Sequence, residues 1–322
     1  PFMPRSRLLH HPAPFPVLRG SVPHALPWFA WERRPKTPKK VIFDKKDTKT
    51  LKGFFALLVI LHHIGSIIGL GVNSPNAKVG GIAVAGFFML SSYGLIKSYK
   101  KNDKYYKQIF LVKIPVLYLT QVAVNFIYWV LFYNSHLKGL PAVLRILNFD
   151  FLYNFQRLNG YSWFITTIIV FYALFGLATF ITSLLKSKAK NHGLITSVIT
   201  TLLIFGLSVG IFLSDVPNLY IRSVNCFVFG LFIALYEDKL CHIINKLYLV
   251  WLAVSLALMV ISILYISEEF ANLFTMVFFI VLSIKFSLSH NFVLNFMGEI
   301  SLSIYLMQLI PFTKTPLTYT FY

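Results

Sequence analysis

Two adjacent histidines, His62 and His63, lie in an apolar segment, residues 52–70, that is long enough to cross a bilayer. Ionisable side chains are costly in that environment, so their presence indicates a function. Lys52 and His63 are eleven residues apart. On a helix their side chains would point only about 20° apart and lie about 16 Å apart along the axis, whereas His62 would point about 80° away. This pattern predicts one site, with a basic group at its base and an imidazole above it on the same helix face.

The composition is typical of a polytopic membrane protein. Of the 322 residues, 57% are hydrophobic and 13% are charged, which is outside the soluble globular range. A formal net charge of +19 could indicate nucleic acid, but the lysines and arginines form short clusters between apolar stretches. Membrane topology explains these clusters better. We therefore expect a lipid bilayer, and no nucleic acid, around the chain.

We predict an all-α fold, a polytopic transmembrane helix bundle of about nine to ten spans. A hydrocarbon core of about 30 Å requires a helix of about 17 to 25 residues, and each apolar stretch has this length. The nine stretches cover residues 52–71, 78–97, 109–133, 161–185, 194–213, 219–236, 246–266, 270–289 and 292–311. Too few residues follow the last stretch for a tenth helix, so we expect the C-terminal helix to be missing.

Positive charge sets the predicted orientation, because cytoplasmic loops carry an excess of Lys and Arg. The clusters at residues 45–52, 97–107, 186–190 and 239–246 all fall on one side of the predicted bundle. We therefore place the start of the first span on the cytoplasmic side. The 134–160 loop then lies on the outer side, where we expect it to contact an acceptor.

The first 40 residues differ in kind from the rest. They hold nine of the 15 prolines and five of the eight arginines, and the first isoleucine is Ile42. Such a stretch cannot build a packed core. We therefore divide the chain into a non-core leader, residues 1–44, which we expect to be disordered or non-native, and a membrane domain, residues 45–322.

The familiar motifs of soluble enzymes are missing from the sequence. It contains no phosphate-cradling glycine loop, no zinc-type His/Cys spacing and no nucleophile elbow. We therefore expect no metal site.

Six short blocks, in order along the chain, carry a resemblance to a known family. LKGFFALLVILHH, residues 51–63, has a basic residue, a glycine, an apolar run and a histidine at the spacing of the first helix in bacterial membrane acyltransferase family 3. GFFMLSSYGLI, residues 86–96, is similar to the second helix of that family. FLVKIPVLYL, residues 110–119, has the basic residue and proline that begin its third helix.

The other three blocks are SWFITTIIVFY, CFVFGLFI and MGEISLSIYLMQ, so the resemblance covers residues 51–308. The chain also departs from the family pattern. Lys52 and Lys113 stand where arginine is usual, Ser92 replaces a glycine, and Gln308 stands where many members have histidine. Lysine still attracts phosphate, although as a point charge and not as a bidentate fork.

The resemblance implies that residues 45–322 are a membrane acyltransferase-like domain and that the protein is an O-acyltransferase of the bacterial cytoplasmic (inner) membrane. Such an enzyme transfers an acyl group, commonly acetyl, from cytoplasmic acyl-coenzyme A to a hydroxyl of a cell-surface or lipid-linked carbohydrate. Acyl-coenzyme A is then a co-substrate, and no permanently bound cofactor is expected. The oligomeric state leaves no readable mark in the sequence.

This chemistry assigns roles to particular residues. His63 is the expected base, because imidazole suits proton transfer near neutral pH. Lys52 and Lys113 are expected to bind the coenzyme A phosphates, aided by Lys104 and Lys107. Donors for the developing oxyanion are needed in a dry cavity. The candidates by type are Ser91, Ser92, Tyr93 and Gln308.

His62, Trp163 and Glu299 are further possible supports of the site. Each assignment has a structural alternative. A membrane histidine can simply bond across a helix interface, serines often mediate helix packing, and Trp163 could be an interfacial anchor. Lys52 could merely follow the excess of positive charge on the cytoplasmic side.

Two other functions fit the sequence. A secondary transporter or flippase of a lipid-linked sugar could line its path with the same basic and histidine residues, although such proteins often show repeats and interrupted spans. An inactive, truncated homologue is the other alternative.

Overall fold

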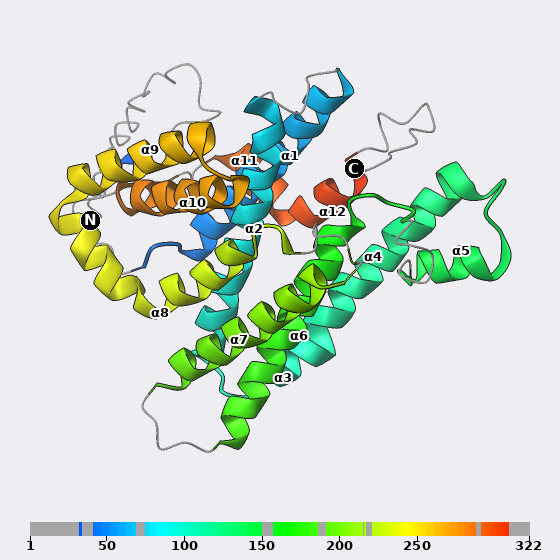
Figure 1. Ribbon diagram of the computed structural model, residues 1–322, viewed down its shortest axis with the longest axis horizontal. Coiled ribbons are helices and arrows are strands. Elements are labelled where there is room, and N and C mark those ends of the chain that lie inside the picture. The colour runs from blue at the N-terminus through cyan, green and yellow to red at the C-terminus, as the bar shows by residue number, and fades with distance from the viewer. Residues whose placement is uncertain are drawn as a thin grey trace, which may run out of the picture.

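The computed structural model describes residues 32–33, 41–68, 75–149, 157–185, 191–214, 216, 221–287 and 291–308. The predicted all-α bundle is confirmed (Figure 1). Its helices are α1 (Lys45–Ile67), α2 (Pro75–Tyr99), α3 (Tyr105–Gln108), α4 (Ile114–Tyr128), α5 (Gly139–Ile146), α6 (Ser162–Leu184), α7 (His192–Phe212), α8 (Val224–Lys246), α9 (Tyr248–Tyr265), α10 (Glu268–Lys285), α11 (Phe292–Glu299) and α12 (Ser301–Met307). Two π-helical segments, η1 (Ile109–Lys113) and η2 (Trp129–Tyr133), flank α4, and a two-residue strand β1 (Glu32–Arg33) pairs antiparallel with β2 (Phe286–Ser287).

Helices lie over each of the nine stretches predicted to span the membrane. Within the described residues, five helices are long and apolar enough to do so by length and composition. They are Lys78–Tyr99, Tyr105–Tyr133, Ser162–Leu184, His192–Phe212 and Tyr248–Tyr265. The chain is therefore a membrane protein, and the exact number of its spans stays a prediction.

The ninth predicted stretch is not one continuous helix. It breaks at Ile300, whose backbone (φ −100°, ψ 14°) is not helical, into α11 and α12. The Ser301 hydroxyl donates to the Gly298 carbonyl at 3.1 Å. Serine side chains that bond nearby backbone in this way compete with helix continuation. The predicted end of this stretch, residues 309–311, lies outside the described residues.

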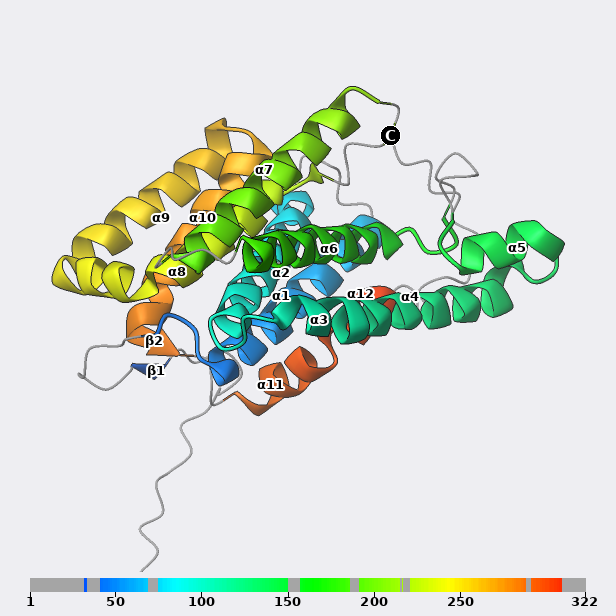
Figure 2. The same ribbon diagram turned by 90° about the horizontal axis from the view of Figure 1, so that it is seen from below.

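α2 is the central helix of the bundle. Figure 1 shows it between α8, α9 and α10 on one side and α4 and α6 on the other, and Figure 2 shows α9 and α4 on opposite sides of it from below. Glycines on α2 and α8 allow this close packing: a Cβ added at Gly86 of α2 would clash with the Phe55 ring on α1, and one at Gly230 of α8 would clash with Ser92 on α2. Small residues at such crossings let membrane helices approach closely.

α1 and α11 cross with their backbones in contact. A Cβ at Gly53 would collide with the Leu294 carbonyl oxygen, and a Cβ at Gly298 would collide with the Lys49 carbonyl oxygen. Two glycines, one on each helix, therefore fix how α11 lies along the first half of α1.

The packed core begins earlier than the predicted boundary at residue 44. Ile42 is fully buried and Phe43 is 3% exposed, and both belong to the main hydrophobic core. Most of the predicted leader before them lies outside the described residues.

Candidate active site

His63 lies on the last part of α1 and contacts Tyr161, at the start of α6. The Nδ1 atom of His63 is 3.3 Å from the Tyr161 hydroxyl, and the two rings are 4.4 Å apart between centroids. The His62 ring stands 4.8 Å from that of His63 in an edge-on arrangement. His62 itself packs against α2, where a Cβ at Gly80 would lie 2.6 Å from its ring. The half-buried His63 is therefore held between two rings.

Asn159 positions Tyr161. The Asn159 side-chain oxygen accepts the Tyr161 N–H at 3.0 Å, and its side-chain amide donates to the Leu306 carbonyl of α12 at 3.0 Å. Asparagine commonly bonds the backbone two residues on in this way and fixes a tight turn. Neither Asn159 nor Tyr161 is among the site residues predicted from the sequence. Their position just before the SWF block and at the start of a predicted span was the only available signal.

Aromatic rings and a buried amide continue the site beyond Tyr161. The Tyr305 ring of α12 lies 6.3 Å from that of Tyr161 and 4.7 Å from that of Phe164. Gln308 follows three residues later and is 8% exposed. Both polar atoms of its amide are buried without a hydrogen-bond partner among the described residues. An unpaired buried amide is costly, which indicates a group that a ligand could satisfy.

The second predicted end of the site is also brought together. Lys52 on α1 and Lys113 on η1 lie close enough to repel each other electrostatically. The Lys113 ammonium lies 5.3 Å from the Tyr105 ring centroid and 5.9 Å from that of Tyr172. The Tyr172 side chain lies near Ser91 of α2. Within the described residues neither lysine forms an ion pair with a carboxylate, so the pair is suited to an anionic ligand.

The turn that ends at Lys113 has an unusual hydrogen-bond pattern with a clear cause. η1 is a π-helical turn that ends at Lys113, two residues before Pro115. Proline cannot donate a backbone hydrogen bond, and its ring clashes with the carbonyl four residues earlier. A widened turn avoids this clash, and π-helical turns inside α-helices are frequent at functional sites. Lys104 and Lys107, the expected helpers, lie exposed at the start of the same long helix.

Four other residues predicted to support the site contact residues other than His63, Lys52 and Lys113. Ser92 is fully buried and donates to the Met89 carbonyl at 3.0 Å, and Glu299 pairs with Lys49 near the surface. Tyr93 bonds to Glu237 on α8. Trp163, 7% exposed, packs edge-on against Phe164 with ring centroids 6.2 Å apart. Of these four residues, only Trp163 lies next to the aromatic rings of Phe164, Tyr305 and Tyr161 beside His63.

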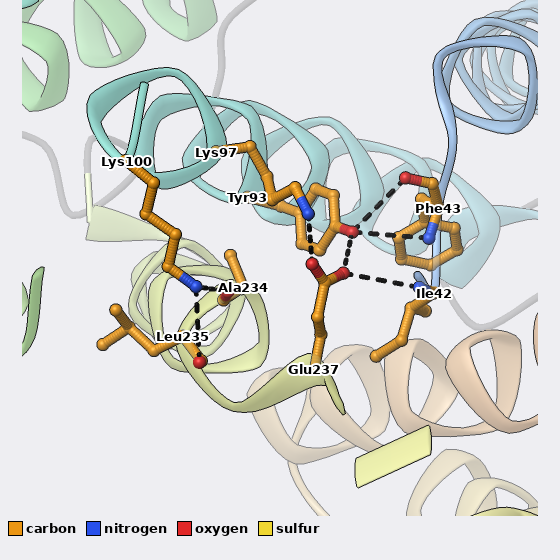
Figure 3. Close-up of polar contacts among 8 residues, drawn as sticks. All are labelled: Ile42, Phe43, Tyr93, Lys97, Lys100, Ala234, Leu235 and Glu237. Carbon is orange, nitrogen blue, oxygen red and sulfur yellow. Dashed lines mark hydrogen bonds and ion pairs between the residues drawn. The ribbon is translucent and has the colours of Figure 1, made fainter. Parts of the chain in front are cut away.

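Glu237 is the centre of a polar network that the sequence did not reveal (Figure 3). Its carboxylate, 4% exposed, accepts from the Lys97 ammonium, the Tyr93 hydroxyl and the Ile42 N–H. The Phe43 N–H donates to the same Tyr93 hydroxyl at 3.4 Å. The network therefore joins the segment before α1 to both α2 and α8.

A kink in α8 lies beside this network. Tyr236 has non-helical backbone angles (φ −107°, ψ 15°), and the sixth predicted span ended at this residue. The kink leaves carbonyls of the preceding turn without helical partners. The Lys100 ammonium donates to two of them, that of Ala234 at 2.7 Å and that of Leu235 at 3.4 Å (Figure 3). A kink with such an identifiable partner is a fixed feature of the fold.

No group of three or more His, Cys, Asp or Glu side chains within the described residues is arranged to hold a metal ion.

A comparison with protein families identifies the family of the chain. A family model described as an acyltransferase domain, that of acyltransferase family 3, matches residues 48–321. No curated protein and no solved structure matches the chain. The family match begins within the first turn of α1 and includes all the site residues described above, so the chain belongs to acyltransferase family 3 and is an acyltransferase.

Proposed function

We propose that the protein transfers an acyl group, most simply acetyl, from cytoplasmic acyl-coenzyme A to a hydroxyl of a cell-surface or lipid-linked carbohydrate. The observation that carries this proposal is the placement of two different groups on one helix. α1 brings His63 against Tyr161 at one level and Lys52 close to Lys113 at another. Eleven residues of helix separate the two ends by about 16 Å.

His63 is the proposed general base. In this proposal its Nδ1–H donates to the Tyr161 hydroxyl, which leaves Nε2 to take the proton of the acceptor hydroxyl. The acceptor oxygen attacks the thioester carbonyl carbon, and the carbon–sulfur bond then breaks. The thiolate of coenzyme A leaves and recovers the proton from the imidazolium. His63 therefore returns to its starting state after each transfer.

Lys52 and Lys113 are the proposed phosphate-binding groups. The donor is anionic at its phosphates, and lysine ammonium groups are common phosphate binders. Bringing two cations together without a carboxylate is unfavourable until an anion neutralises them. The acyl end of the donor would then extend along α1 toward His63.

Gln308 is the proposed donor to the developing oxyanion. Its buried side-chain amide has no partner among the described residues, and it follows Tyr305, which lies against Tyr161. A preorganised donor in a site without water stabilises a developing negative charge more than water does. Ser91 instead lies at the donor end, near Tyr172.

The proposed location is the inner membrane, with the start of α1 in the cytoplasm. The contacts of Glu237 support this orientation, because they bring residues 42–43, the end of α2 and α8 together at one end of the bundle. Three of the predicted basic clusters begin next to these contacts. The fourth, residues 186–190, lies outside the described residues.

The test is release of coenzyme A from labelled acetyl-coenzyme A by the purified protein, compared between the wild type and His63→Ala. A general base contributes about 10²–10⁴-fold to a rate, so we expect turnover in the variant to fall by at least about 100-fold. Lys113→Met should instead raise the donor concentration needed for half-maximal rate and change the maximal rate little.

His62→Ala is the matched control, because it removes the neighbouring ring and keeps the contact between His63 and Tyr161. Turnover in His63→Ala that equals the wild-type rate would refute the base. If a well-folded wild type released no coenzyme A, the proposed reaction would give way to transport or to an inactive homologue.

A further inference from the structure

The α5 helix does not lie apart from the bundle as an outer loop would, but folds back along the long helix that precedes it. Side chains of that helix hold the returning backbone: Trp129 donates to the Leu137 carbonyl at 2.8 Å, and Tyr118 donates to the Leu147 carbonyl at 2.9 Å. Between these two points, Asn125 donates to the Ile146 carbonyl at 3.3 Å. The two segments therefore form an antiparallel hairpin, residues 118–149, at the edge of the molecule (Figures 1 and 2).

The first segment of this hairpin has the length and surface of a membrane span. The helix Tyr105–Tyr133 is a candidate span, and no Asp, Glu, Lys or Arg lies between Lys113 and Lys138. From Lys113 to Tyr133 it rises about 30 Å, which matches the thickness of the hydrocarbon core.

Exposed apolar residues form one uninterrupted stripe along this helix, at intervals of three, four or seven residues. The stripe consists of Val112, Val116, Leu119, Phe126 and Val130. A helix presents residues at such intervals on one face. Gln121 bonds to the first turn of α6 and so marks the level at which α6 begins. The stripe continues beyond this level, to Val130 on the hairpin.

α5 lies beside this stripe and exposes apolar residues of its own. Leu140 is 66% exposed and Val143 is 49% exposed, whereas Ala142 between them is buried. The end of the hairpin at Leu147 reaches the level of Tyr118, about 22 Å back along the helix from Tyr133. If the span fills the hydrocarbon core, α5 must lie inside that core and not in the water beyond it.

Two polar side chains of the hairpin, Gln121 and Asn148, bond to each other and to α6. Asn148, whose backbone is left-handed (φ 65°), accepts from Gln121 at 2.5 Å and donates to Thr166 of α6 at 3.0 Å. Non-helical backbone is tolerated at membrane depth when it is bonded within the protein. The one charged residue of α5, Arg145, is half-buried, and a long arginine side chain can carry its charge toward polar surroundings.

We propose that α5 is a re-entrant helix that lies in the leaflet on the His63 side of the membrane, with Leu140 and Val143 in contact with lipid acyl chains. The occupant of this apolar face is lipid because the face continues the lipid-facing stripe of the adjoining span. This proposal is independent of the reaction, and it holds whether or not His63 is the base.

The test measures the surroundings of single nitroxide labels in proteoliposomes. Labels are placed at Leu140→Cys and Val143→Cys, with Leu119→Cys on the stripe as the lipid reference and Ser135→Cys in the exposed turn as the water reference. All four positions are exposed, so the labels should not disturb packing. The native Cys226 and Cys241 are buried, and the wild type carried through the same labelling checks that they remain unmodified.

We expect labels at Leu140 and Val143 to collide mainly with oxygen, which concentrates in the bilayer, as the label at Leu119 does. The label at Ser135 should collide mainly with a water-soluble nickel chelate. Nickel collisions at Leu140 and Val143 equal to those at Ser135 would overturn the proposal, because they would place α5 in water.

Discussion

The contact between His63 and Tyr161 joins residues 98 positions apart in the chain, and its geometry depends on a single turn. Asn159 bonds both the Tyr161 N–H and the Leu306 carbonyl, so the start of α6 is fixed relative to α12. The aromatic ring at Tyr305 closes the other side of Tyr161. Tyr161 therefore has little freedom, which is the property required of a residue that orients a catalytic imidazole.

Tyr161→Phe tests this positioning role. The change keeps the ring and removes the hydroxyl that lies 3.3 Å from His63 Nδ1. We expect the maximal rate of coenzyme A release to fall about tenfold, the equivalent of one lost hydrogen bond, with no change in the donor concentration needed for half-maximal rate. The donor phosphates would bind at the other end of α1, so a purely catalytic effect is expected.

Tyr118→Phe is the matched control. It likewise removes one tyrosine hydroxyl, here one that donates to the Leu147 carbonyl, but Tyr118 lies on the α5 hairpin and not beside His63. A fall in maximal rate of the same size in both variants would show that the loss in Tyr161→Phe comes from general weakening of the fold.

At the scale of the elements, most of the architecture could be predicted from the sequence. Long apolar stretches must form helices in a bilayer, because every backbone polar group there needs an internal partner. The phase of Lys52 and His63 on α1 likewise follows from helix geometry alone. The residues that complete the site are a different matter.

Contacts between helices could not be predicted in this way. In the sequence, Tyr161 is simply the first residue of a predicted span, and Glu237 belongs to the charged segment that follows another span. Their importance comes from partners in distant parts of the chain, which the local sequence does not reveal. The return of α5 along the preceding helix depends on side-chain bonds from Tyr118 and Asn125, which leave no periodic signal. Periodicity predicts which face of a helix is apolar but not which helix will cover it.

The crossing of α1 and α11 gives a prediction at this scale. Gly298→Ala would place a methyl group against the Lys49 carbonyl oxygen, and backbone cannot move aside as a flexible side chain can. We expect a loss of about 1–3 kcal/mol in the free energy of unfolding, the usual cost of overpacking. The thermal unfolding midpoint of the purified protein in detergent measures this loss.

Gly206→Ala in α7 is the control for this variant, because an added Cβ there meets no atom within 4 Å. Its midpoint should stay the same or rise slightly, since alanine favours a helix over glycine by about 1 kcal/mol. Equal midpoints for the two variants would mean that α1 and α11 do not cross this closely.

At the scale of the whole molecule, the network around Glu237 ties together three parts of the chain that the helix pairs alone would leave independent. The segment at Ile42 and Phe43 precedes α1, Tyr93 and Lys97 lie on α2, and Glu237 lies beyond the kink of α8. The same contacts keep these segments at one end of the bundle, close to where Lys52 and Lys113 would receive the donor. We therefore expect the network to act on global stability more than on the chemical step.

Lys97→Met tests this expectation, because it removes the cation and leaves the Glu237 carboxylate buried (Figure 3). An uncompensated buried charge typically costs about 3–5 kcal/mol, and the remaining bonds from Tyr93 and Ile42 should keep the loss near the lower value. The unfolding midpoint should fall accordingly. Adding Glu237→Gln to Lys97→Met should then restore part of the loss, because the neutral amide no longer needs a counter-ion.

Lys100→Met is the matched control, since Lys100 donates only to the carbonyls of Ala234 and Leu235. It lies three residues from Lys97 on the same end of α2, so a general effect of removing a lysine there would appear in both variants. A smaller loss in Lys100→Met and a partial recovery in the double variant would establish Glu237 as the residue that requires Lys97. Additive losses in the double variant would instead show that the two side chains act independently, and the network would then not be what holds the three segments together.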